Sequence, residues 1–217
     1  EKLQKELQNK DIQLAKRLAT VQRIARKIAE GDYSVRANED EKDHLGGIAA
    51  ALNEMTEALQ KSFDEISQNE WKQTGLVKIN EILTGNKPEI EIETDALAHL
   101  IHYGECMNGA FYILENKKLA LKSAYGLEST MLKDYQPGEG MVGQVFLDKK
   151  IKLLENIAKE DYVVSFANGK IKLANILWLP LTAKGECFGV VELASDTEFE
   201  EVDLEFFQDA CKLITLE

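Results

Sequence analysis

Two repeating patterns of apolar residues in the first sixty positions most constrain how this chain folds. The first pattern advances in steps of 4, 3, 4 and 3 residues and the second in steps of 3, 4, 3 and 4. Such heptad spacing is typical of helices that meet along a narrow, coiled-coil-like contact. We call these residues the predicted seam: Leu14, Leu18, Val21, Ala25, Ile28, Leu45, Ile48, Leu52, Met55 and Leu59.

A short connector separates the two seams. Gly31 and Asp32 are expected to stop the first helix, because Gly suits the position just past a helix end. Tyr33 and Val35 alternate with polar neighbours and predict an extended stretch. A connector of about a dozen residues can return along the bundle, so the two helices are predicted to run parallel. Two chains forming a parallel four-helix bundle would bury both seams, which predicts a parallel homodimer; the alternative is a helical hairpin packed on the rest of the chain.

The residues of this region resemble a HAMP domain over positions 12–60. The resemblance depends on the Gly31-Asp32 break, the Asp-x-x-Gly start of the second helix at Asp43, and the Asn-x-Met at Asn53. It implies a relay of signals from transmembrane sensors. Two positions depart from the family pattern: Arg17 stands where Pro is usual, and His44 stands where Glu is usual. His44 is interpreted as a cap or surface residue, with a pH switch as the alternative.

Residues 60–83 predict one continuous helix, which Gly85 and Pro88 end. This helix is expected to leave the bundle and become the first helix of a second domain, so that it transmits rotation or a register change. Residues 69–76 resemble the joint between HAMP and GAF domains in bacterial sensor kinases. The expected domains are therefore a helical relay module at 1–70 and an α+β domain at 71–217.

The second domain is predicted to contain a central antiparallel sheet with helices. The expected helices are 94–107, a short one from 137 to 146, and 201–217; the expected strands are 110–114, 119–124, 151–154, 176–181 and 188–194.

The second domain resembles a GAF domain over most of residues 75–217. The segments that carry the resemblance are 109–112, 124–126, 138–144, 179–181 and 189–195. GAF domains bind small molecules or dimerise, and pass the result on through their terminal helices. HAMP followed by GAF resembles bacterial membrane-associated sensor histidine kinases of two-component systems, which implies a sensor protein whose output domain follows this chain.

Strand alternation divides the sheet residues between two faces. The leucines at 177, 179 and 181 suit a helix-covered face, which leaves Trp178 and Glu192 on the other. Met141, Phe166 and Asn168 lie on segments expected to cover that other face. These five residues are the candidate ligand pocket. No cofactor is predicted, an unidentified small-molecule ligand stays open, and the alternative is a filled face with Glu192 bonded to backbone amides.

No catalytic or metal site is legible in the sequence. The Gly-rich stretch 138–143 lacks the Gly-Lys-Ser/Thr ending of a phosphate loop and is interpreted as a turn and helix start. His99 and His102 are three residues apart, without a third ligand nearby. Cys106, Cys187 and Cys211 are interpreted as buried structural thiols. The alternatives are a GAF-type sulfoxide reductase that uses cysteine chemistry and a chromophore-binding sensor; the cyclic-nucleotide GAF signature is absent.

Charge and composition limit the partners. The net charge of -12 argues against nucleic acid. No run of about 18 apolar residues is present, no signal peptide is expected, and three cysteines without a CxxC spacing favour a reducing, cytoplasmic setting. The chain starts and stops inside helical patterns. We therefore expect it to be the cytoplasmic part of an inner-membrane protein, with a transmembrane or sensor element upstream and an output domain downstream.

Overall fold

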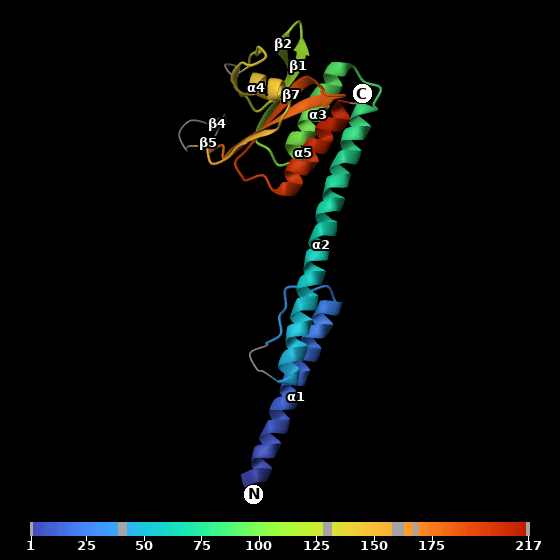
Figure 1. Ribbon diagram of the computed structural model, residues 1–217, viewed down its shortest axis with the longest axis vertical. Helices are drawn as coiled ribbons and strands as arrows, with labels where there is room; N and C mark the ends of the chain where they lie inside the picture. Colours follow the sequence, from blue (N-terminus) through green and yellow to red (C-terminus); the bar gives the residue numbers. More distant parts are fainter. Residues whose placement is uncertain (1, 39–42, 128–131, 158–162, 167–168, 216–217) are drawn as a thin grey trace. The chain divides into compact units, whose positions relative to one another are not determined.

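The computed structural model (Figure 1) describes residues 2–38, 43–127, 132–157, 163–166 and 169–215. The chain divides into two compact units, Glu1–Asn69 and Glu70–Glu217. The helix α2 (His44–Leu83) is uninterrupted and contributes residues to both units. Each unit is described separately below.

In the first unit, α1 (Lys2–Ala29) and the start of α2 run parallel, as predicted. Contacts that lie further along α1 involve positions further along α2. Arg17 pairs with Asp43 just before α2, whereas Ile24 and Ile28 share an apolar cluster with Ala49. Gly31 adopts a φ of 91° directly after α1, so the chain turns there at a position that favours Gly.

Two side chains of the HAMP-like pattern hold the connector and the start of α2. Asp43 accepts a hydrogen bond from the Gly46 amide at 2.8 Å and therefore caps α2. Asn53 accepts from the Ala37 amide at 2.7 Å and donates to the Ala37 carbonyl at 2.9 Å. The Asn53 side-chain amide thus satisfies both backbone polar groups of Ala37, as the backbone of a neighbouring β-strand would. The motif residues Asp-x-x-Gly and Asn-x-Met therefore have a direct structural reason.

The second unit is built on a five-stranded antiparallel sheet in the order β2-β1-β7-β6-β3. Its strands are β1 (Asn108–Glu115), β2 (Lys118–Tyr125), β3 (Lys152–Leu154), β6 (Asn175–Ala183) and β7 (Glu186–Ser195). Two tight turns join neighbouring strands. Asn116 and Lys117 in one turn, and Lys184 and Gly185 in the other, all have positive φ, which is the type I′ geometry that matches strand twist.

Helices cover the sheet on both faces (Figure 1). The helices α3 (Glu89–Tyr103) and α5 (Glu201–Ile214) pack on one face together with the end of α2. The helix α4 (Gly140–Asp148) packs on the other. Phe111, Leu179 and Val191 belong to the first apolar cluster, and their neighbours Tyr112, Trp178 and Val190 to the second. The predicted division of the strand residues between two faces is confirmed.

Two features differ from the sequence expectation. The helix expected at 94–107 is α3 at Glu89–Tyr103, because Pro88 at the N-cap starts the helix at once and acidic Glu89 and Glu91 favour its first turn. The sheet expectation also missed a separate hairpin of β4 (Val163–Phe166) and β5 (Gly169–Lys172). These strands are only four residues long, too short for a clear alternation.

Within the second unit, α2 is held by polar and aromatic contacts from α3 and α5. The Tyr103 hydroxyl donates to the Trp71 carbonyl at 2.6 Å, and the Tyr103 and Trp71 rings stack with centroids 5.0 Å apart. His99 Nε2 lies 3.0 Å from the Gly75 carbonyl oxygen. Lys72 forms an ion pair of 2.6 Å with Glu205 of α5. We call these contacts the α2 clamp.

Gly75 permits this clamp to close. A Cβ atom at Gly75 would lie 2.5 Å from the Tyr103 ring and 2.6 Å from the Phe206 ring. Neither ring can move aside freely, because Phe206 is fully buried and the Tyr103 ring is in contact with the rings of both Trp71 and Phe206. By contrast, every residue from 61 to 70 is exposed in the chain. The stretch of α2 that precedes the clamp therefore has little tertiary support within one chain.

We predict that Gly75→Ala destabilises the second unit by about 1–3 kcal/mol, because the added methyl group forces the aromatic rings of the clamp apart. Urea unfolding followed by tryptophan fluorescence measures this, since Trp71 lies in the clamp. The matched control is Gly47→Ala, another α2 glycine, whose Cβ would meet no atom within 4 Å. That control is expected to be neutral or slightly stabilising. Equal effects of the two changes would contradict the steric argument.

Candidate functional site

Trp178 and Glu192 form a buried polar pair on the α4-covered face of the sheet. They are directly opposite each other on β6 and β7. The Trp178 indole N–H donates to Glu192 Oε2 at 2.5 Å. Trp178 is only 5% exposed, so the bond lies in an apolar setting formed with α4 residues such as Val142 and Val145. A buried carboxylate needs such a partner, because unpaired charge is costly to bury.

The pair changes the electrostatics of this face. Burial raises the pKa of Glu192, and the hydrogen bond from Trp178 only partly offsets that rise. Burial and the Glu192 carboxylate also raise the pKa of Tyr112, which lies on the same face from β1. Tyr112 packs edge-on against Tyr135 with ring centroids 5.5 Å apart. The arrangement offers an acceptor and a phenol within an otherwise apolar layer, which suits recognition of a polar group by a few directed bonds.

The structure brings together two of the five predicted pocket residues, Trp178 and Glu192. Met141 is in the first turn of α4 and is 40% exposed. Phe166 belongs to β4, but its side chain is outside the described part of the chain, as is Asn168. The filled-face alternative supposed that backbone amides donate to Glu192. In the structure the donor is the Trp178 indole. Tyr112 was missed in the sequence; its position in strand β1, one residue past Phe111, was the available signal.

The predicted seam divides into inner and outer residues within one chain. Ile28 is buried, and Val21, Leu45 and Leu52 are half-buried. The other six are exposed: Leu14, Leu18, Ala25, Ile48, Met55 and Leu59. Ile24, which the seam prediction omitted, is buried against Ala49 instead. One chain therefore covers part of the seam and leaves large apolar side chains uncovered.

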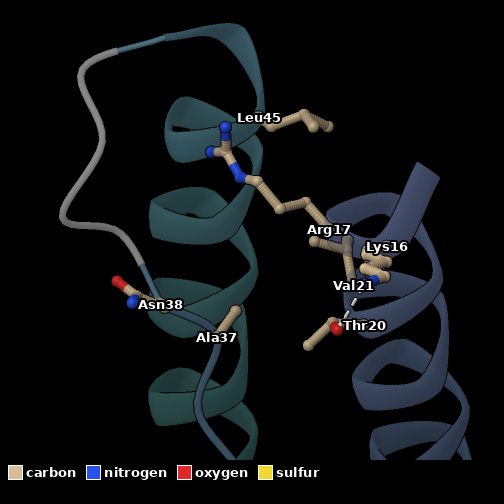
Figure 2. Close-up of a pocket in the computed structure, with 7 residues that line it drawn as sticks. All are labelled: Lys16, Arg17, Thr20, Val21, Ala37, Asn38 and Leu45. Carbon is tan, nitrogen blue, oxygen red and sulfur yellow. Dashed lines mark hydrogen bonds between the residues drawn. The ribbon is translucent and has the colours of Figure 1, made fainter. Parts of the chain in front are cut away.

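A groove of about 260 Å³ lies between α1, α2 and the connector (Figure 2). Val21 and Leu45 of the predicted seam line it, together with Thr20 and Ala37. The Arg17 side chain reaches from α1 toward the start of α2 (Figure 2), and its two guanidinium nitrogens lie 2.7 and 3.1 Å from the Asp43 carboxylate. This ion pair and the Gly46 amide lower the pKa of Asp43 to about 2.

Each of the two units matches the model of a known protein family. A family model for the GAF domain matches residues 87–216, which is more than half of the chain. The chain belongs to the GAF domain family. A family model for the HAMP domain matches residues 13–61. The predicted order of a HAMP domain followed by a GAF domain is thus confirmed, and it marks the chain as part of a signalling sensor.

Solved structures similar to the GAF domain share its fold at low identity. The A. aeolicus NLH2 GAF domain in an inactive state has 23% identity and a TM-score of 0.56, covering 69% of this chain and 96% of that one. The GAF domain of an Acinetobacter phosphoenolpyruvate-protein phosphotransferase has 18% identity and a TM-score of 0.54, with coverage of 69% and 90%.

An enzyme shares the same fold. Free methionine-R-sulfoxide reductase of Neisseria meningitidis, in complex with its substrate, has 17% identity and a TM-score of 0.54, with coverage of 67% and 86%. No curated protein matches the chain. In the described part of the chain, no helix is both long and apolar enough to cross a bilayer.

The cysteines and histidines of the GAF domain have structural surroundings. Cys106, Cys187 and Cys211 are free and buried, as predicted. Burial raises the thiol pKa of Cys106 and of Cys211 to about 12, so these thiols are protonated near neutral pH and are poor nucleophiles. His99 belongs to the α2 clamp, and His102 packs edge-on against Tyr125. Among the described residues, no three His, Cys, Asp or Glu side chains are grouped to hold a metal.

The Gly-rich stretch of the GAF domain forms the turn before α4 and the first turn of that helix, as interpreted from the sequence. The Gly138 amide donates to the Gly143 carbonyl at 2.9 Å, and a Cβ atom at Gly143 would lie 2.3 Å from the Gln136 carbonyl oxygen. The glycines thus serve a close approach of two backbone segments.

We predict different effects from two changes at Glu192. Glu192→Leu leaves the buried indole N–H without an acceptor and should destabilise the GAF domain by about 1–3 kcal/mol. Glu192→Gln keeps an acceptor oxygen and removes the buried charge, so it should be neutral or stabilising at pH 7.

The pH dependence of the Glu192→Gln effect follows from the raised pKa. The pKa of Glu192 is higher in the folded protein than in the unfolded chain. The wild type therefore has its full stability at low pH, where Glu192 is protonated in both states. It loses stability as the pH rises from the unfolded-state pKa through the folded-state pKa. The stability gain of Glu192→Gln over the wild type should therefore grow across this range and then level off. Urea unfolding at several pH values measures it; a gain that shrinks with rising pH would contradict the buried-charge explanation.

Proposed function

We propose that this chain relays and modulates a signal within a dimeric sensor protein, and that it carries no catalytic site of its own. The observation that supports this proposal best is α2, which runs without a break from the HAMP domain into the α2 clamp of the GAF domain. A continuous helix transmits a rotation or an axial shift, which a flexible linker would absorb. The HAMP domain would receive the input and the GAF domain would adjust it.

Dimerisation is part of the proposal. The exposed seam residues Leu18, Ile48 and Met55 are 47–52% exposed in one chain. Large apolar side chains in a heptad repeat are normally covered by a facing helix. A second chain packed in parallel would cover them and would also close the groove beside Val21 and Leu45. We therefore infer a parallel four-helix bundle in the HAMP domain.

The wider context is inferred from the resemblance. The joint at residues 69–76 is similar to that of bacterial sensor histidine kinases, so we propose a histidine kinase as the output domain and a membrane-bound sensor as the source of input. The ligand proposed for the GAF domain is a small molecule at the Trp178–Glu192 face. Met141 lies on α4, which covers this face, and Phe166 and Asn168 stay predicted members of the pocket.

The alternative function is a cysteine-dependent redox enzyme, and one structure of similar fold is a sulfoxide reductase. The geometry of the thiols does not favour it. Cys211 is 3% exposed and Cys106 is 9% exposed, and both have strongly raised pKa values. A catalytic thiol needs access and a substantial thiolate fraction. The relay is therefore the better supported proposal.

We predict that single charges in the predicted seam weaken the dimer. Leu18→Asp or Ile48→Asp should raise the dimer dissociation constant by tenfold or more, because a buried carboxylate replaces an apolar contact of about 1.5–3 kcal/mol. Sedimentation equilibrium of the full chain measures this. The control is Ala19→Asp, an exposed α1 position outside the seam with the same added charge. A monomeric wild type at moderate concentration would refute the dimer.

We predict that signal transfer depends on the rotational phase of α2. Two alanines inserted after Ser67 rotate the following helix by about 200°, whereas a seven-residue duplication of Lys61–Ser67 leaves it within about 20° of its original phase. In a chimera with a histidine kinase core, the first insertion should change autophosphorylation strongly and the second only slightly. Equal effects would show that α2 acts as a spacer, and no effect from either would exclude a helical relay.

A further inference from the structure

A cavity of the GAF domain lies on the sheet face opposite Trp178 and Glu192. This cleft has a volume of about 530 Å³ and we call it the helix-side cleft. Its apolar walls come from the end of α2, from α3, from three strands and from α5. They include Leu83, Ile92, Phe111, Ile113, Leu181 and Phe188. Its volume is within the range of small-molecule sites.

The charged residues at the helix-side cleft select the kind of ligand. Glu89, Glu93 and Lys87 line it, but the Lys87 ammonium is already paired with Asp95 at 2.5 Å. The Lys122 ammonium, which attracts Glu93 from a distance, is hydrogen-bonded to Glu115. The cations nearby are thus engaged by other carboxylates. An anionic ligand would therefore compete with carboxylates for these two cations and would be repelled by Glu89 and Glu93.

Of the two carboxylates that line the cleft, Glu93 is the more buried. It is half-buried on α3, and within the described residues it forms no hydrogen bond and no ion pair closer than 4 Å. Burial raises its pKa, the Lys122 ammonium offsets only part of that rise, and the neighbouring carboxylates Glu89 and Glu115 add to it. A ligand cation would relieve this electrostatic cost, since an opposite charge within about 4–6 Å favours the ionised carboxylate.

We propose that the helix-side cleft binds an organic cation with an apolar body, whose ammonium or guanidinium group pairs with Glu93. The apolar body lies against Ile92, Ile113 and Phe188, and the cation faces α3. Phe188 is 48% exposed although it is a large aromatic side chain, and a ligand in this position would cover it. Because α2, α3 and α5 all contribute to the cleft, occupancy would favour one arrangement of the three helices. The site is independent of the proposed pocket at Trp178 and Glu192.

The test compares n-decylammonium with decanoate and decanol, all below micellar concentration, on the full 217-residue chain. Isothermal titration calorimetry is expected to give the tightest binding for n-decylammonium, and amide chemical-shift changes should cluster at Ile92, Ile113 and Phe188. Equal binding of n-decylammonium and decanoate would overturn the proposed role of charge. No binding of n-decylammonium, or shifts that cluster at Tyr112, Trp178 and Glu192, would overturn the site.

Variants separate the carboxylate from the apolar wall. Glu93→Gln should weaken n-decylammonium binding by about tenfold, as expected for loss of one charge-assisted contact. Phe188→Ala should weaken it by about threefold while leaving the fold intact, since this side chain is half exposed. The control Glu91→Gln removes the same charge from an exposed α3 position that does not line the cleft, and should leave affinity unchanged.

Two results would contradict the variants' interpretation. If Glu91→Gln weakened binding as much as Glu93→Gln, the attraction would be a general effect of the acidic surface. If Phe188→Ala changed the oligomeric state in sedimentation, a second copy of the chain would occupy the cleft in place of a small molecule. Either result would overturn the proposal.

Discussion

The organisation of the GAF domain depends on the packing of α2 against α3 and α5. Ile79 of α2 is fully buried in the same apolar cluster as Leu100 and Phe207. The backbone carbonyls of Trp71 and Gly75 are also contacted by side chains of α3. A helix held in this way cannot rotate without breaking polar bonds and displacing packed rings. Any rotation that reaches residue 71 must therefore be shared with α3, α5 and the sheet beneath them.

The heptad steps and strand alternation were sufficient to predict much of this architecture. The two helices, the uninterrupted course of α2 through residue 83 and the two faces of the sheet follow from the periodicity of apolar residues. The parallel direction of α1 and α2 follows from the length of the connector. Local chemistry explains the hairpin turns at Asn116 and Gly185, where positive φ is needed. These features depend on near neighbours in the sequence, so the sequence alone was informative.

Features that depend on contacts between distant segments were harder to predict. The partner of Glu192 is an indole across a strand pair, and the sequence could indicate only that a partner was needed. The role of Asn53 depends on Ala37, a connector residue sixteen positions earlier in the chain whose amide donates to the Asn53 side chain. Tyr112 belongs to an apolar cluster with residues of other strands and of α4. The helix-side cleft is likewise lined by residues from several strands and helices. Periodicity assigns a residue to a face but does not specify which side chains on that face meet.

The exposed stretch of α2 from residue 61 to residue 70 has a consequence for how such a protein can evolve. Within one chain, this stretch is supported by its own helical hydrogen bonds, by local pairs such as Lys61 with Glu65, and by a ring contact between Phe63 and Tyr33. Its persistence as helix therefore depends on intrinsic helix propensity, which differs by up to about 1 kcal/mol per residue among residues other than Pro. Surface substitutions there would change the stability of this stretch gradually, and with it the strength of the proposed relay, without altering the core of either domain.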